Sequence, residues 1–231
     1  MSLFVPMHIA CPHCDATVTM DAVGSVNADR RGDLRDAILN DTFQIVTCHA
    51  CGGAFRLVPN FNYLDVGNRL WIAALPPDKL PEHATEIAMA TQTFAESYGA
   101  RAPSGAREVG ETLDVRVTFG WQAVREKLLA RVNGIDDVDL ELLKLLMLRS
   151  APGATLGEGI EGRLVDVGED SLTIAWIDRR TEGAKSMQSV DRGMLEQVKM
   201  LDGPWADLRA TLADGLFVDV QKLYLLDDMA A

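Results

Sequence analysis

The sequence predicts an α+β protein that begins with a small cysteine-rich ribbon and continues into mixed strands and helices. Three observations indicate this class. Strand-like residues flank two Cys-x-x-Cys pairs within 7–58. Apolar residues at helical spacing follow over 121–149. Two strand-like segments joined by a Gly-Glu-Asp-Ser turn then occupy 162–177.

The first elements are two hairpins whose turns carry the cysteines. The first cysteine pair lies between strand-like residues 7–9 and 18–20, and the second lies between 42–47 and 55–58. The gap of 33 residues between the pairs is long, so it must itself contain folded structure. The segment 33–40, DLRDAILN, is typical of a short helix and is expected to fill it.

Cys11, Cys14, Cys48 and Cys51 are all the cysteines of the chain. A C-x-x-C turn directs two sulfurs at one point, and two such turns supply the four tetrahedral ligands that zinc prefers. Gly52 directly follows the second pair, together with a second glycine, where the turn needs positive φ or a close backbone approach. The pattern predicts one structural zinc ion and therefore a zinc ribbon with an inserted helix.

Other chemistries use the same residues and remain open alternatives. A rubredoxin-like iron centre has the same ligand set, and two disulfides or a redox-active pair would need other surroundings. His8, His13 and His49 lie close to the cysteines, but four thiolates already complete a tetrahedron. We expect these histidines to be exposed or to neighbour the sulfurs, and His83 to lie on the surface.

The middle of the chain predicts a strand followed by a two-helix segment. Leu113, Val115, Val117 and Phe119 alternate with polar residues, which is typical of a half-buried antiparallel strand. The other expected elements are a strand at 70–75, helices at 82–98, 121–132 and 137–149, and a turn-rich linker at 99–110.

A small C-terminal α+β module is expected after the Ala-Pro-Gly break at 151–153. It contains the two strands within 162–177 and a helix at 204–213, whereas 188–201 and 217–226 are ambiguous between strand and helix. Residues 156–231 carry 8 basic and 15 acidic side chains, a local charge of −7. The predicted domains are therefore 1–150 and 156–231.

The helix at 137–149 is apolar around most of its circumference. A helix packed on one side of its own domain shows an apolar stripe, with polar residues on the other side. Here leucines cover most faces, and the segment before them offers little to bury them. We expect Leu142, Leu143 and Leu146 to form a homodimer or partner interface; the alternative is a fully internal core helix.

Composition excludes several classes of function. No stretch has the roughly 20 apolar residues of a membrane span, and the first residues lack an export signal, so a cytoplasmic protein is expected. The net charge is −12, and the Arg30–Arg31 pair lies among acidic residues. Nucleic-acid binding is therefore disfavoured. No phosphate-binding loop or nucleophile elbow is present.

Several segments together resemble the bacterial CpXC family. They are ACPHC, TCHACGG, LWIAALPP and VTFGWQAVREKLLARVNGIDDVDLELLKLLM, which span about 8–148. The family is named for cysteine pairs with an inserted proline, and Pro12 fits that form, whereas His49 takes the proline position in the second pair. The resemblance implies a zinc ribbon but no reaction, substrate or catalytic residue.

Three functions follow in order of preference. The first is a non-enzymatic zinc-binding adaptor or regulatory subunit in a bacterial cytoplasmic assembly, because the predicted zinc is structural and catalytic groups are not recognised. The second is a nucleic-acid- or transcription-associated zinc-ribbon protein, against which the charge argues. The third is an enzyme with an unrecognised site.

Overall fold

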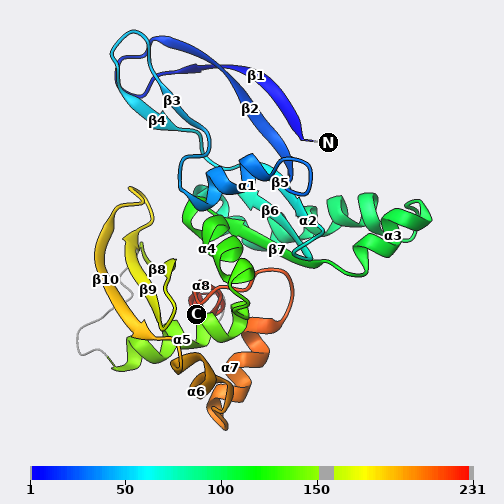
Figure 1. Cartoon of the computed structure of the whole chain (residues 1–231), viewed down its shortest axis with the longest axis vertical. Coiled ribbons are helices and arrows are strands. Elements are labelled where there is room, and N and C mark those ends of the chain that lie inside the picture. Colours follow the sequence, from blue (N-terminus) through cyan, green and yellow to red (C-terminus); the bar gives the residue numbers. More distant parts are fainter. Residues whose placement is uncertain (1, 151–158, 229–231) are drawn as a thin grey trace. The chain divides into compact units, whose positions relative to one another are not determined.

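The computed structural model describes residues 2–150 and 159–228, and the chain separates into two compact units. Unit 1 comprises Met1–Pro76 and Ala88–Trp121, and unit 2 comprises Pro77–Ile87 and Gln122–Ala231. The elements of both units are labelled in Figure 1. Helices and mixed sheets occur together, so the predicted α+β class is confirmed.

Unit 1 is built on a five-stranded sheet with the order β1-β2-β5-β6-β7. Its neighbours alternate between antiparallel pairs (β1/β2 and β5/β6) and parallel pairs (β2/β5 and β6/β7). The strands are β1 (Leu3–Ala10), β2 (Thr17–Asn27), β5 (Phe61–Asp65), β6 (Leu70–Leu75) and β7 (Asp114–Phe119).

The strand expected at 113–119 is present, but the prediction that it is antiparallel is wrong. The observed β7 runs parallel to β6, with Leu70 opposite Asp114 and Leu75 opposite Phe119. Parallel strands need a crossover connection, and the 77–110 segment between them supplies it with helices. Burial does not alternate along β7, because its last three residues are all enclosed.

The cysteine-bearing hairpins form as predicted. One is β1/β2, and the other is the two-stranded sheet of β3 (Ile45–Thr47) and β4 (Ala54–Arg56). Between them, α1 (Gly32–Leu39) fills the long gap and buries Ile38 completely. The two hairpins and the inserted helix that the sequence predicts for the ribbon are therefore confirmed.

The expected linker at 99–110 is mostly a helix. After a turn, α3 (Ser104–Gly110) follows α2 (His83–Tyr98), and a Cβ on Gly110 would come within 2.6 Å of the Cβ of Tyr98. The glycine thus permits a close packing contact and does not mark a free linker. Turn-rich composition alone did not distinguish these two roles.

An aromatic cluster fixes the base of the ribbon within unit 1. Phe43, Phe61 and Trp121 have ring centroids 5.5 to 5.6 Å apart. The Trp121 indole N–H donates to the Leu57 carbonyl at 2.6 Å, and the Arg56 guanidinium lies 4.1 Å from the Trp121 ring. Cation–π and hydrogen-bond contacts thus hold the residues just after β4.

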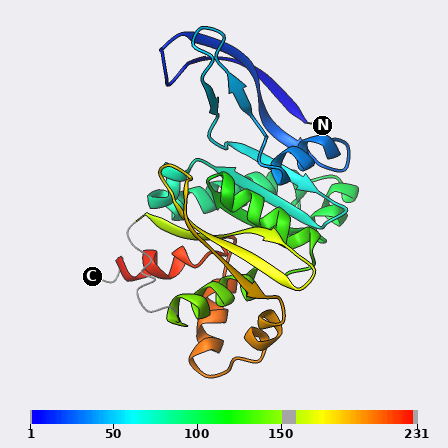
Figure 2. The same cartoon turned by 60° about the vertical axis from the view of Figure 1, so that its left-hand side comes forward.

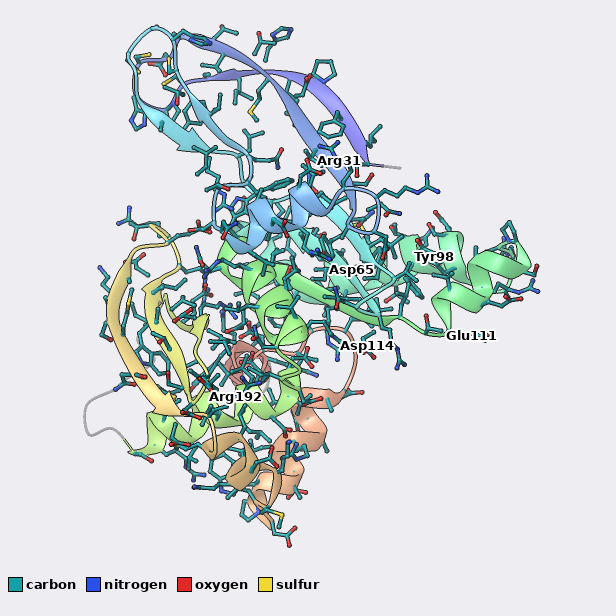
Figure 3. The ribbon with its side chains drawn as sticks, viewed as in Figure 1. Arg31, Asp65, Tyr98, Glu111, Asp114 and Arg192 are labelled. Atoms are coloured by element: carbon teal, nitrogen blue, oxygen red, sulfur yellow. The ribbon has the colours of Figure 1, made fainter. Side chains whose placement is uncertain are left out.

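Asp65, labelled in Figure 3, closes the end of β5 with a buried polar cluster. Its carboxylate accepts hydrogen bonds from the Tyr63 hydroxyl at 2.9 Å and from the Asn68 side chain at 2.8 Å. Arg35 of α1 is 3.8 Å away. A buried carboxylate needs such partners, so this cluster is structural.

Unit 2 packs helices with a three-stranded antiparallel sheet of order β10-β9-β8. In Figure 2 the yellow strands β8 and β9 lead into β10, followed by the orange helices. The strands are β8 (Ile160–Val167), β9 (Ser171–Asp178) and β10 (Ala184–Asp191). The helices are η1 (Pro77–Glu82), α4 (Trp121–Val132), α5 (Asp137–Ser150), α6 (Met194–Lys199), α7 (Pro204–Ala213) and α8 (Gln221–Asp228).

The compact units differ from the predicted domains 1–150 and 156–231. Leu140, Leu142 and Leu143 of α5 lie in one core with β8, β9 and the helices after them. Buried residues of α5, β8 and β9 thus share one core, and the second unit includes Gln122–Ser150. The expected boundary at 151–155 lies outside the described residues.

The predicted interface through Leu142 and Leu143 is wrong. Both side chains are fully buried inside the core of unit 2, which is the internal-helix alternative. Leu146 keeps partial exposure on the same helix. No helix of residues 2–150 and 159–228 is long and apolar enough to cross a membrane.

Candidate metal centre

The two cysteine turns repeat the same backbone hydrogen bonds. The Cys11 N–H donates to the Ala16 carbonyl and the Cys48 N–H to the Gly53 carbonyl, each at 2.9 Å. The Cys11 carbonyl also accepts from Asp15 at 2.9 Å, as the Cys48 carbonyl does from the equivalent residue at 2.8 Å. Two copies of one turn therefore present their cysteines in the same way.

Each turn closes through a residue with positive φ. Gly52 has φ +74°, as the glycine pair after the second cysteines predicts, and Asp15 has φ +59° at the equivalent place in the first turn. Gly53 is needed for space rather than for its backbone conformation. A Cβ there would approach the His13 ring at 2.5 Å and the Cys51 sulfur at 3.3 Å. This glycine lets the two turns pack against each other.

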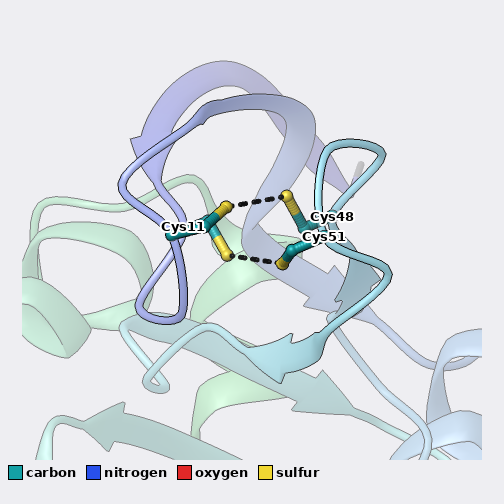
Figure 4. A group of neighbouring side chains, drawn as sticks. Cys11, Cys48 and Cys51 are labelled. Atoms are coloured by element: carbon teal, nitrogen blue, oxygen red, sulfur yellow. Dashed lines mark hydrogen bonds between the residues drawn. The ribbon is translucent and has the colours of Figure 1, made fainter.

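The four sulfurs meet at one point (Figure 4). The Cys11 and Cys51 sulfurs are 3.7 Å apart, as are those of Cys14 and Cys48, and all four lie within 4.8 Å of one another. With Zn–S bonds of about 2.3 Å, a regular tetrahedron has sulfurs about 3.8 Å apart. No disulfide links these cysteines. They can hold one metal ion.

Backbone N–H groups stabilise sulfur charge at this centre. The His13 N–H lies 3.4 Å from the Cys11 sulfur, and the Gly53 N–H lies 3.4 Å from the Cys51 sulfur. The backbone N–H of Cys51 lowers the pKa of the Cys48 thiol to about 6. The pKa of Cys14 is raised instead, because the lowering effect of the backbone N–H of Ala16 is outweighed by hydrogen bonding with the other cysteines and by burial. Metal binding requires thiolates, so the backbone donors favour that form at Cys48, whereas Cys14 would lose its proton to the metal.

A small apolar shell shelters half of the centre. Cys11 and Cys48 are buried against Val18, while Cys14 and Cys51 are exposed. Ile9, Ala16, Val46 and Phe55 pack around the buried pair. The metal would thus join two thin hairpins that have little apolar core of their own.

The nearby histidines do not complete a ligand set. His8, His13 and His49 are exposed, and the group of possible ligands among the described residues contains the four cysteines alone. His13 Nε2 lies 3.2 Å from the Ala54 carbonyl, and His8 Nδ1 lies 2.9 Å from the Thr19 hydroxyl. His83 is half-buried and stacks loosely on Phe217, 6.4 Å between centroids, so it is less exposed than expected.

A second chemical cluster, the buried ion network, lies in unit 2 and was missed from sequence. Lys144 Nζ lies 2.7 Å from Glu126 and 2.8 Å from Glu141, and all three are fully buried. Arg163 lies 2.6 Å from Asp219 and 3.1 Å from Glu126. Glu161, Lys127, Asp137 and Gln221 extend the network.

The network binds the core together through backbone groups as well. The Leu164 N–H donates to Glu126 at 2.5 Å, and the Val220 N–H donates to Glu141 at 3.0 Å. Lys127 donates to the Val218 carbonyl at 2.6 Å. These bonds tie α4 and α5 to β8 and to the segment before α8. Its central groups are enclosed and mostly hydrogen-bonded, with Arg163 Nε and Gln221 Oε1 left without a partner. Because the charged groups pair with one another inside the core, the network supports the core.

Comparison with known proteins identifies one relationship. The family model described as CpXC protein matches residues 9–144, which is more than half of the chain and includes all four cysteines. No curated protein and no solved structure matches the chain.

Proposed function

The chain belongs to the CpXC family, and we propose that it is a non-enzymatic zinc-binding protein whose metal ribbon supports a protein-interaction surface. In this role it acts as an adaptor or regulatory subunit of a bacterial cytoplasmic assembly. The proposal has two parts, the metal and the surface, and each rests on a different observation.

The closed sulfur set carries the metal part. Four cysteine sulfurs lie within 4.8 Å of one another, which matches a tetrahedral site. Catalytic zinc keeps a position for water or substrate, whereas four thiolates fill the tetrahedron. We propose zinc rather than iron because a closed set of four cysteines is a common structural zinc site. In this protein zinc would fix the turns of β1/β2 and β3/β4.

An exposed apolar surface supports the interaction part. We call it the β1 face: Leu3, Val5 and Met7, which alternate along β1, together with Val58, all exposed. A shallow groove of about 330 Å³ runs along it. The groove is lined by Val5, Met7, Ala22, Val23, Gly24, Gln44, Leu57, Val58 and Asn60, none of them charged. Exposed apolar patches of this kind mark protein contacts.

Substitutions on the β1 face test the proposal. Tagged wild-type protein is purified from its native host beside Val5→Glu and Val58→Glu, with Met200→Glu as the matched control. Met200 is exposed in unit 2, so its variant adds the same charge elsewhere. Burying an unpaired carboxylate in an interface is costly. We expect a stoichiometric partner with the wild type and Met200→Glu, and its loss with both β1-face variants.

The result is read only for variants that keep their fold and metal, checked by circular dichroism and elemental analysis. Recovery of the same partner with all four proteins would refute the β1 face. A metal-loaded wild type that turns over a substrate in an activity screen would refute the non-enzymatic role.

A further inference from the structure

A second cavity, of about 640 Å³, lies in unit 2 at the end of β9. It is lined by Pro77, Asp78, Gly159, Asp178, Arg179 and Arg180. The volume is that of a small-molecule site, which typically has about 300 to 1,000 Å³. The metal ribbon belongs to unit 1, so this cavity is independent of it.

Arg179 is a partly enclosed cation in the cavity wall. Its side chain is 31% exposed, and its Nε atom is buried without a hydrogen-bond partner. The nearest acceptor is a Glu161 oxygen at 3.7 Å, which itself accepts from Arg163 at 2.9 Å and Gln221 at 2.5 Å. Glu161 therefore orients Arg179 by charge, but it does not accept a hydrogen bond from the guanidinium. A planar guanidinium gains strongly from a bidentate anion.

Arg180 adds a second cation beside it. Its side chain is exposed, and its backbone N–H donates to Asp178 at 3.0 Å, which fixes the turn. The backbone of Arg179 is also fixed, because its N–H donates to the Gly159 carbonyl at 2.8 Å. Consecutive arginines are thus held on a defined turn at the cavity mouth.

The two acidic residues of the wall have different roles. Asp178 caps the turn by accepting from Thr181 at 3.1 Å and pairs with Lys185 at 3.5 Å. The turn N–H donors and Lys185 hold the pKa of Asp178 below its usual value. The Asp178 carboxylate is therefore already bound by groups of the turn and by Lys185. Asp78 belongs to η1 and also lines the cavity, where it offers an acceptor to a ligand hydroxyl.

We propose that this cavity binds a small hydroxylated organic anion, with Arg179 and Arg180 holding its phosphate or carboxylate and Asp78 accepting from a hydroxyl. The Glu161 end of the buried ion network acts as the support that orients Arg179. The site requires no metal and no chemical step, so binding can be measured directly.

Three ligands of one carbon skeleton test the site on the full, metal-loaded chain by isothermal titration calorimetry. They are glycerol 3-phosphate, glycerate and neutral glycerol, at constant ionic strength. We expect saturable binding of at least one acid and none of glycerol. The phosphate and carboxylate arms show which anion the site prefers. Arg180→Gln should weaken binding about tenfold or more, which corresponds to about 1.4 kcal/mol.

Matched variants separate the site from general charge effects. Arg30→Gln removes an exposed arginine of unit 1 and should bind as the wild type does. Arg179→Lys keeps the charge but loses the planar fork and should also weaken binding. Neither acid binding saturably would overturn the proposal. Equal affinity in the wild type, Arg180→Gln and Arg179→Lys would also overturn it, as would equal weakening by Arg30→Gln.

Discussion

Lys144 illustrates what a single residue contributes to the core of unit 2. Its fully buried ammonium contacts both Glu126 and Glu141. Lys144→Met would leave two enclosed carboxylates without their shared cation, and breaking such a buried pair typically costs about 3 to 5 kcal/mol. Urea unfolding followed by tryptophan fluorescence measures this loss in the free energy of unfolding.

Lys199→Met is the matched control for that prediction. Lys199 also forms a pair with a glutamate three residues away, at 2.6 Å, but both side chains are exposed. Exposed pairs contribute little, so this variant should unfold like the wild type. Equal unfolding midpoints for both variants would show that the buried ion network is not stabilising.

Glu141 makes the stability of unit 2 depend on pH. Burial raises the pKa of its carboxyl from the usual 4.5 to about 7, and the charges of Asp219 and Glu126 add to the rise against the attraction of Lys144. The folded protein thus holds a proton that the unfolded chain releases. Its stabilising effect is complete below the unfolded pKa and is lost as pH rises through the folded pKa.

Glu141→Gln removes that titration. We expect the difference in unfolding free energy, wild type minus variant, to fall as pH rises from about 4.5 to about 7. Glu126 and Asp219 have lowered pKa values, so their contribution is lost as pH falls. Glu126 and Asp219 are present in both the wild type and the variant, so their contributions largely cancel in the difference in unfolding free energy. A difference that is constant or rises over this range would contradict the assignment.

Among the elements, the β8/β9 pair depends on a glycine. Gly162 lies opposite Trp176, and a Cβ there would approach the indole ring at 2.7 Å. The ring cannot easily move because its N–H donates to Gln188 on β10 at 3.0 Å. Gly162→Ala should therefore destabilise the protein by about 1 to 3 kcal/mol, as overpacking does.

Gly105→Ala provides the opposite case for the same substitution. Gly105 lies in α3, and an added Cβ there meets no atom within 4 Å. Alanine favours helix over glycine by up to about 1 kcal/mol, so this variant should be slightly more stable. Thermal unfolding of both variants checks the pair, and a tolerated Gly162→Ala would show that the strand contact is looser than described.

Local patterns predicted most elements because the periodicity of their apolar residues was decisive. The cysteine hairpins, the helix at 204–213 and the strands within 162–177 appear where expected. β5 was missed because Phe61–Asp65 is short and its polar residues, Asn62 and Asp65, do not alternate with the apolar ones. The direction of β7 depends on the distant β6, which a local pattern does not report.

The buried ion network shows the same limit for sites. The spacing of the four cysteines predicts a metal site, and the structure brings their sulfurs together. In contrast, Glu141 and Lys144 appeared to be the polar face of an apolar helix. Their partners lie on α4, β8 and the segment before α8, up to 79 residues away in sequence. A charged pair within a leucine-rich helix was the available signal.

At the scale of the whole molecule, the division into units predicts which fragments can fold. Residues 156–231 alone would lack α4 and α5, which share one core with β8 and β9. Leu164, Leu172 and Ile174 would lose part of the burial that stabilises them. We expect this fragment to be insoluble or molten by circular dichroism and proton NMR. A cooperatively folded fragment would support the domain boundary predicted from sequence.

The central claim is that Cys11, Cys14, Cys48 and Cys51 hold one structural zinc ion, and elemental analysis of the purified chain tests it most directly. We expect about one zinc per chain. A Cys48→Ser and Cys51→Ser double variant should lack the metal and become sensitive to protease, because the binding energy is partly folding energy. Stoichiometric iron, or no metal together with two disulfides by mass spectrometry, would contradict the account.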